Sequence, residues 1–215
     1  MTPCPLCHTS ENLTRLEGQG KRTYSRCPEC ALIFVGKGDV LPAEEEKSRY
    51  LEHKNGIQYP GYVKFLNQAI EPALPLLKPG DRGLDFGCGP VPTLSILMER
   101  HGYECADYDP FFVPEKPKGP FDFIFATECF EHFFDPAAEM DYINSLLAPG
   151  GLLIIMTVFW KDEGELISGF YFRDPSHVVF YHRETIEWLA NRYGFVIEHT
   201  DDERIVILRK GRSKL

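Results

Sequence analysis

The sequence predicts an α/β fold with a mostly parallel sheet, preceded by a small cysteine-rich module. Short apolar segments alternate with amphipathic ones from about residue 62 onward, and a glycine-rich turn follows the first apolar segment. Four of the seven cysteines fall in two close pairs within the first 30 residues. At 215 residues, the chain has room for one large core and one small module, but not for two full catalytic domains.

The cysteine pairs have the spacing of a structural zinc site. Cys4 and Cys7 form one C-x2-C pair, Cys27 and Cys30 form the other, and nineteen residues separate the pairs. Each pair supplies two thiolates from one tight turn, so two pairs complete a tetrahedral shell around Zn²⁺. Four protein ligands leave no position for water, and we therefore expect a structural ion. His8 is an alternative ligand, and packing of the cysteines without a metal is the competing interpretation.

We expect three regions along the chain. Residues 1–38 are a zinc-ribbon module with short strands at 21–26 and 31–35, and residues 62–215 are the large domain. Residues 39–61 between them are polar and turn-rich. The aromatic residues between Tyr50 and Tyr62 favour a lid over a plain surface linker, because aromatic side chains in an entry loop can cover a bound ligand.

The large domain begins with a predicted helix from residue 62, which prolines 72, 75 and 79 end. Strands are expected at 83–86, 103–108 and 121–126, with a helix from near Pro92 to Gly102 after the first of them. Only eleven residues separate Asp109 from Phe121. A crossover helix and a further strand need about a dozen residues or more, so we expect a sheet shortened at this point.

The second half of this domain continues the alternation. A helix through residues 143–147 precedes a turn at 149–151 and a strand at 152–158 that is apolar throughout, as in a strand buried on both faces. A final helix through residues 186–193 ends at Gly194, which can adopt the left-handed conformation of a helix cap. Residues 195–198 and 204–209 are expected to form a closing antiparallel pair.

The glycine-rich turn after the first strand disfavours a dinucleotide cofactor. A dinucleotide fingerprint has a third glycine at the position that Pro92 occupies. Asp85 lies two residues before Gly87, where its carboxylate would repel a pyrophosphate but could hold an ammonium group.

These motifs together resemble those of class I methyltransferases that use S-adenosylmethionine. Residues 85–89 are similar to the family's Asp-x-Gly-x-Gly motif, residues 121–125 to its fourth strand, residues 126–132 to the following loop, and residues 147–151 to the turn before its fifth strand. The matches cover residues 80–160 in the family's order. The resemblance implies a Rossmann-like fold and a cofactor site, whose residues would be Asp85, Gly87, Cys88, Gly89, Asp109, Thr127 and Glu128. In the family, an acidic residue at the position of Asp109 binds the ribose hydroxyls; Asp107 is a competing candidate, and the acidic residue that reads adenine has no counterpart.

The residues that act on the methyl acceptor should lie on loops at the carboxyl ends of the strands, where ligands bind in open α/β sheets. Residues 173–189 resemble a stretch found in methyltransferases with N-terminal zinc ribbons, some of which methylate sugar carbons. We expect His177 to be the general base, oriented by Asp174 and Ser176, with His132 and then His182 as alternatives. A histidine between a strand and a helix can equally be a capping or packing residue.

Charge and hydropathy narrow the range of partners and locations that we expect for this protein. A net charge of −9 disfavours a nucleic-acid partner, because contacts from Lys and Arg to phosphates dominate such affinity. The apolar run at 152–160 is too short to cross a membrane and no secretory signal is visible, so we expect a cytoplasmic protein. The leading hypothesis is a methyltransferase for a small molecule, such as a sugar or another hydroxylated metabolite. The alternatives are a zinc-ribbon RNA methyltransferase and a non-catalytic interaction module on the same scaffold. The sequence does not identify the acceptor or the oligomeric state.

Overall fold

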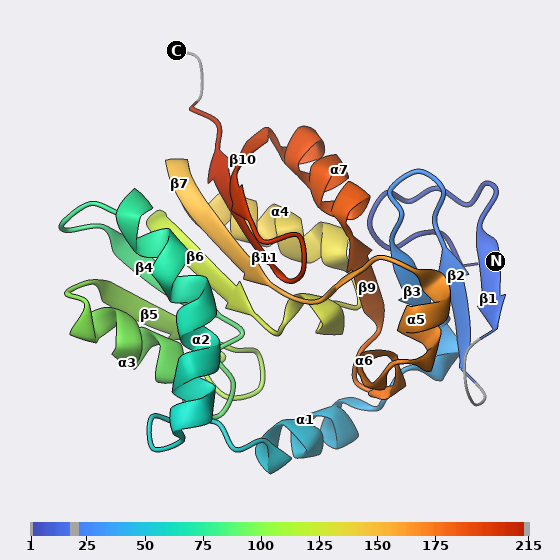
Figure 1. The fold of residues 1–215 in the computed structure, drawn as a ribbon, viewed down its shortest axis with the longest axis horizontal. Coiled ribbons are helices and arrows are strands. Elements are labelled where there is room, and N and C mark those ends of the chain that lie inside the picture. The colour runs from blue at the N-terminus through green and yellow to red at the C-terminus, as the bar shows by residue number, and fades with distance from the viewer. Residues whose placement is uncertain (1, 18–21, 213–215) are drawn as a thin grey trace.

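The computed structural model describes residues 2–17 and 22–212, which form two sheets (Figure 1). The larger sheet has six strands in the order β10-β11-β7-β6-β4-β5, and the smaller has five in the order β1-β2-β3-β9-β8. Over the described ranges, no helix combines the length and the apolar character needed to cross a membrane.

Strands β4, β5, β6 and β7 of the larger sheet are parallel; β11 pairs antiparallel with β7, and β10 pairs antiparallel with β11. The strands are β4 (Arg82–Phe86), β5 (Glu104–Tyr108), β6 (Phe121–Thr127), β7 (Leu147–Met156), β10 (Phe195–Thr200) and β11 (Ile205–Lys210). This arrangement confirms the predicted α/β class. Strand β7 begins five residues earlier than residue 152, because Leu147 already pairs with Phe121 before the register resumes at Leu152.

Helices cover both faces of this sheet. Helices α2 (Pro60–Ala73) and α3 (Thr93–Arg100) pack on one face, and α4 (Pro136–Leu146) and α7 (Arg183–Tyr193) pack on the other (Figure 1). Alternate side chains of β7 enter the two cores: Leu152 and Ile154 join one, while Leu153 and Ile155 join the other. Strand β7 is therefore the central strand buried on both faces that its continuous apolar sequence predicted. Gly194 ends α7 with φ of +70°.

The sheet is shortened where the sequence predicted it. Strand β5 is the edge strand, and residues 109–120 run from it to β6 with a single bridge between Asp109 and Val113. The short proline-rich connection has no room for a crossover helix and a further strand.

The smaller sheet joins segments from both ends of the chain. Strands β1 (Thr14–Glu17), β2 (Thr23–Arg26) and β3 (Ile33–Val35) form an antiparallel ribbon, of which β1 was not predicted. Strand β3 then pairs with β9 (Val179–His182), and β9 pairs with β8 (Phe159–Trp160). The chain leaves this sheet after β8 and rejoins it at β9, and the segment between the two strands carries His177. Because β3 pairs with β9, the ribbon lies against the end of that segment.

Residues 39–61, the segment predicted to be a linker or lid, contain a helix. Helix α1 (Ala43–Glu52) has three glutamates in its first turn and Arg49 in its last, charges that favour the two ends of the helix dipole. The remaining short elements are α5 (Glu163–Ser168), α6 (Phe170–Arg173) and the 3₁₀ turns η1 (Lys37–Asp39), η2 (Leu74–Leu76) and η3 (Phe130–His132).

Candidate functional site

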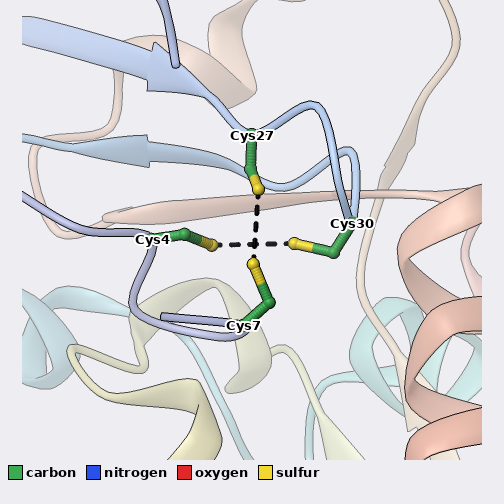
Figure 2. A group of neighbouring side chains, drawn as sticks. All are labelled: Cys4, Cys7, Cys27 and Cys30. Carbon is green, nitrogen blue, oxygen red and sulfur yellow. Dashed lines mark hydrogen bonds between the residues drawn. The ribbon is translucent and has the colours of Figure 1, made fainter. Parts of the chain in front are cut away.

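The four N-terminal cysteines form one cluster (Figure 2). The Sγ atoms of Cys4 and Cys30 are 3.6 Å apart, and those of Cys7 and Cys27 are 3.4 Å apart. Four thiolates around one tetrahedral zinc ion would be separated by about 3.8 Å, given zinc–sulfur bonds of about 2.3 Å. Figure 2 shows the four sulfur atoms directed toward a common centre, two from each turn. The cluster therefore fits Zn²⁺ without rearrangement, and His8 is not among its members.

A cavity of ≈ 520 Å³ lies at the carboxyl ends of the parallel strands. Its wall is built from the turn after β4, the end of β5, the loop after β6, helix α1 and the start of α2, and His177 closes one side. This volume falls within the range of small-molecule sites. All the residues expected to bind a cofactor line this cavity, as do His132 and His177.

The turn after β4 needs its two glycines. Gly87 has φ of +82° and Gly89 has φ of +68°, conformations that side chains disfavour. A Cβ at Gly87 would also lie 2.7 Å from the Cβ of Cys129. A Cβ at Gly89 would meet no atom within 4 Å, so the backbone there is open to a ligand.

Asp85 is a buried carboxylate on the cavity wall. It is 2% exposed, and its Oδ1 has no hydrogen-bond partner among the described residues. Burial, and then the charges of Asp107 and Asp109, raise the pKa of Asp85 well above its usual range. A cationic group of a ligand would satisfy this oxygen and lower that pKa.

Asp109 lines the cavity, and Asp107 does not. One oxygen of Asp109 accepts hydrogen bonds from the backbone N–H groups of Phe111 (2.8 Å) and Phe112 (3.1 Å), and the other accepts from Gly89 N–H (3.1 Å). These bonds fix the carboxylate between the end of β5 and the glycine turn. Of the two acidic candidates, Asp109 is thus the one placed to meet a ligand on that turn.

His132 and His177 lie beside each other on the cavity wall, with ring centroids 5.0 Å apart. The Nδ1 of His132 lies 3.0 Å from the carbonyl oxygen of Ser176, and the Nδ1 of His177 lies 2.7 Å from that of Tyr171. Because a carbonyl only accepts, each Nδ1 carries the proton and each Nε2 keeps a lone pair in the neutral ring. Burial lowers the pKa of His177, which favours that neutral form.

The predicted orientation of His177 by Asp174 and Ser176 is wrong. Asp174 accepts hydrogen bonds from the N–H and hydroxyl of Ser176, at 2.9 and 2.6 Å, and from Arg49 at 2.9 Å. The carbonyl of Tyr171 holds the imidazole instead, because α6 brings that carbonyl beneath the ring. His182 lies outside the cavity wall: its side chain caps α7, and its ring packs 4.3 Å from that of Trp160.

Sequence reasoning indicated Tyr50 and the loop that carries Glu131, but it did not place Glu46 on the cavity wall. Helix α1 contributes Glu46 and Tyr50, and the Tyr50 hydroxyl donates to Glu46 over 2.6 Å. The Tyr50 ring also packs edge-on against His132, with centroids 5.1 Å apart. Glu131, beside His132, is 1% exposed and also lines the cavity. The four-residue spacing of Glu46 and Tyr50 could have indicated a helical pair. The position of Glu131 after the predicted strand at 121–126 pointed to the site, but its burial had no sequence signal.

A family model described as a methyltransferase domain matches residues 58–200. The chain belongs to this methyltransferase family. A search of curated proteins finds no significant match.

The solved structures most informative about the fold of the methyltransferase share 14–18% sequence identity with it. An S-adenosylmethionine-dependent methyltransferase from Archaeoglobus fulgidus has a TM-score of 0.52 at 18% identity, covering 68% of this chain and 94% of its own. The 1,6-didemethyltoxoflavin N1-methyltransferase of Burkholderia thailandensis, solved with S-adenosylhomocysteine, has a TM-score of 0.51 at 14% identity, with coverages of 92% and 99%. The magnesium protoporphyrin IX methyltransferase of Synechocystis PCC 6803 has a TM-score of 0.52 at 16% identity, with coverages of 78% and 94%. The methyltransferase therefore has the Rossmann-like fold that its motifs predicted.

Proposed function

We propose that the protein transfers a methyl group from S-adenosylmethionine to a small hydroxylated molecule such as a sugar. One observation carries this proposal: a single cavity has the glycine turn with Asp85 and Asp109 on one side, and His132 with His177 on the other. A donor on the glycine turn would share this enclosed space with an acceptor beside the histidines. Such an arrangement suits an in-line displacement, whose rate depends on holding both reactants in line.

The cofactor side is built to hold a cationic, hydroxylated donor. When bound, S-adenosylmethionine supplies a methyl group on a positively charged sulfur, which transfer leaves as a neutral thioether. Asp85 would accept hydrogen bonds from the ammonium group, and the open backbone at Gly89 allows close approach. Asp109 would bind the ribose hydroxyls. Cys88, Thr127 and Glu128 would complete the wall of this half of the cavity.

The acceptor side would activate the nucleophilic atom. The free Nε2 atoms of His132 and His177 are the groups that would act on the acceptor, because backbone carbonyls occupy both Nδ1 positions. Tyr50 of helix α1 packs edge-on against His132 and would shield that ring from part of the solvent. This assignment makes α1 part of the lid predicted for the segment from Tyr50 to Tyr62.

The charges of the cavity support a small acceptor over RNA. Seven carboxylates line its wall, and none of the described lining residues is Lys or Arg. The acidic residues are Glu46, Asp85, Asp109, Glu128, Glu131, Asp135 and Glu139. Phosphate groups would meet no cationic side chain among these described lining residues, and the net charge of −9 adds to this effect.

We propose a structural role for Zn²⁺ in the ribbon, with Cys4, Cys7, Cys27 and Cys30 as ligands. Four thiolates leave no open coordination position, so the ion would stabilise the two turns without taking part in methyl transfer. Free thiolates available for a metal are typical of a reducing compartment, which supports a cytoplasmic location.

The function is tested by binding and by transfer. Calorimetry on the full chain should show that S-adenosylmethionine and S-adenosylhomocysteine each bind at a single site. Each compound should displace the other, because the site is shared. Incubation with S-adenosylmethionine labelled in its methyl group and with fractionated metabolite pools should then label a small molecule. Failure to bind either compound would refute the proposal, and labelling confined to RNA would refute the acceptor class.

A further inference from the structure

The acceptor side of the cavity brings together three potential metal ligands. One ring nitrogen of His132, one of His177 and a carboxylate oxygen of Glu131 all lie within 4.8 Å of one another. All three residues line the cavity, so an ion between them would be accessible to an acceptor. Two imidazoles and one carboxylate form the ligand set of many open metal sites, in which the remaining positions are left for water or substrate.

Each of these three residues is hydrogen-bonded by a neighbouring group of the kind that holds metal ligands in place. Each imidazole is held at Nδ1 by a backbone carbonyl, from Ser176 or Tyr171, which leaves Nε2 for an ion. The Thr157 hydroxyl donates to one oxygen of Glu131 over 2.8 Å. Histidine ligands usually donate their other ring N–H to a carbonyl or carboxylate, and carboxylate ligands are themselves hydrogen-bonded.

Glu131 gives an independent indication that a cation is needed. Its side chain is buried, with 1% of the residue exposed, and its Oε1 has no hydrogen-bond partner among the described residues. A buried carboxylate oxygen without a partner is costly unless a cation or a donor satisfies it. Glu128, on the same wall, also has a buried Oε1 without such a partner.

We propose that Glu131, His132 and His177 bind a divalent first-row metal ion, which in turn binds a hydroxyl oxygen of the acceptor. This proposal rests on the proposed function for the identity of the reaction, and the ion is distinct from the structural zinc of the ribbon. Ligand atoms bonded to one tetrahedral or octahedral ion at about 2.1 Å lie about 3.0–3.4 Å apart in neighbouring positions. The ligand atoms of the three side chains lie within 4.8 Å of one another, so they would approach one another by up to roughly 1–2 Å on binding.

The ion would explain how the two histidines act on the acceptor. A divalent metal lowers the pKa of an oxygen that it binds, so the acceptor could lose its hydroxyl proton to solvent near neutral pH. The acceptor oxygen then forms a bond to the methyl carbon, and the breaking carbon–sulfur bond leaves its electron pair on sulfur. The imidazoles need not accept the proton themselves, because their lone pairs are bonded to the ion.

The test is a titration of the full chain with Co²⁺, after one equivalent of Zn²⁺ has filled the ribbon. We expect one Co²⁺ per chain by calorimetry, with visible absorption bands of nitrogen- and oxygen-bound cobalt and without a thiolate-to-cobalt charge-transfer band. Glu131→Gln, His132→Gln and His177→Gln should each weaken Co²⁺ binding by about 100-fold or more. Thr157→Val keeps the side-chain shape and should weaken it about 10-fold. His101→Gln, at an exposed position at the end of α3, is the matched control and should bind like the unmodified chain.

The proposal would be overturned if the unmodified chain did not bind Co²⁺. It would also be overturned if the Glu131, His132 and His177 variants bound Co²⁺ as tightly as the His101→Gln control. If S-adenosylmethionine still binds and His177→Ala still loses turnover in that case, the proposed function stands and the imidazoles act directly. If Co²⁺ binds as expected but neither S-adenosylmethionine nor its product does, the proposed function fails and the metal site remains.

Discussion

The two clusters of potential metal ligands in this protein differ in how they are assembled. The four cysteines come from two tight turns, and their sulfur atoms already lie 3.4–3.6 Å apart across the centre of the cluster. Glu131 and His132 follow β6, whereas His177 precedes β9, and their ligand atoms lie within 4.8 Å of one another. The first cluster is closed and local. The second is open to a cavity, and it depends on the chain between β7 and β9 returning to the sheet.

The largest expected effect concerns the closed cluster. Removing zinc with a chelator, or replacing Cys27 with Ser, should unfold the ribbon, because structural zinc contributes on the order of 10 kcal/mol to folding. The small sheet should melt before the large one, with loss of one zinc per chain. Metal analysis and thermal unfolding followed by circular dichroism measure both effects. Cys105→Ala, at a buried cysteine of β5 outside the ribbon, should keep the zinc; a ribbon that melts together with the large sheet would show that the two sheets are one cooperative unit.

The next effect concerns the open cluster. His177→Ala should reduce turnover by about 100-fold or more and leave the affinity for S-adenosylmethionine nearly unchanged, because His177 lines the part of the cavity that we assign to the acceptor. His182→Ala is the matched control. It removes the cap of α7 and should lower the free energy of unfolding by about 1 kcal/mol without changing turnover. Steady-state kinetics and denaturant unfolding of both variants would separate the roles, and equal turnover in the two would refute the assignment.

Asp109 tests the half of the cavity that we assign to the cofactor, for comparison with the half that we assign to the acceptor. Asp109→Ala should weaken S-adenosylmethionine binding by about 1–3 kcal/mol, since it removes a charged hydrogen-bond acceptor. Asp107→Ala should have little effect on affinity, because Asp107 does not line the cavity. Calorimetry measures both. A larger loss for Asp107→Ala than for Asp109→Ala would reverse the assignment of the ribose contact.

The smallest expected effect comes from replacing single glycines. It separates the strain of a side chain at positive φ from the clash of that side chain with neighbouring atoms. Gly87→Ala and Gly80→Ala both place a side chain at positive φ, at +82° and +89°, and each should lower stability by about 1–2 kcal/mol. A Cβ at Gly87 would also meet Cys129, whereas one at Gly80 would meet no atom within 4 Å. Only Gly87→Ala should therefore weaken cofactor binding as well. Thermal unfolding and calorimetry of the two variants test this, and equal cofactor affinities would show that the turn tolerates a side chain.

The sequence by itself determined the features that depend on local chain geometry. Each C-x2-C turn presents two cysteine side chains together, the short ribbon between the turns brings the two pairs into one cluster, and the glycine turn with Asp85 follows directly from the β4 sequence. The eleven residues between Asp109 and Phe121 excluded a further strand by length alone. The continuous apolar run of β7 likewise indicated a strand buried on both faces.

Only the tertiary structure decided which distant segments meet. The pairing of β3 with β9 brings residues 170–178 back against the sheet, and this places His177 beside His132 and Glu131. The tertiary structure also decided that His177 is held by the carbonyl of Tyr171 and not by Asp174. No sequence spacing could have shown this contact, because every residue has a carbonyl. Glu131 is one of 32 acidic residues. Its burial without a partner for Oε1 arises only when β6, β7 and the loop before β9 pack together, since burial is a property of the packed chain and not of the residue.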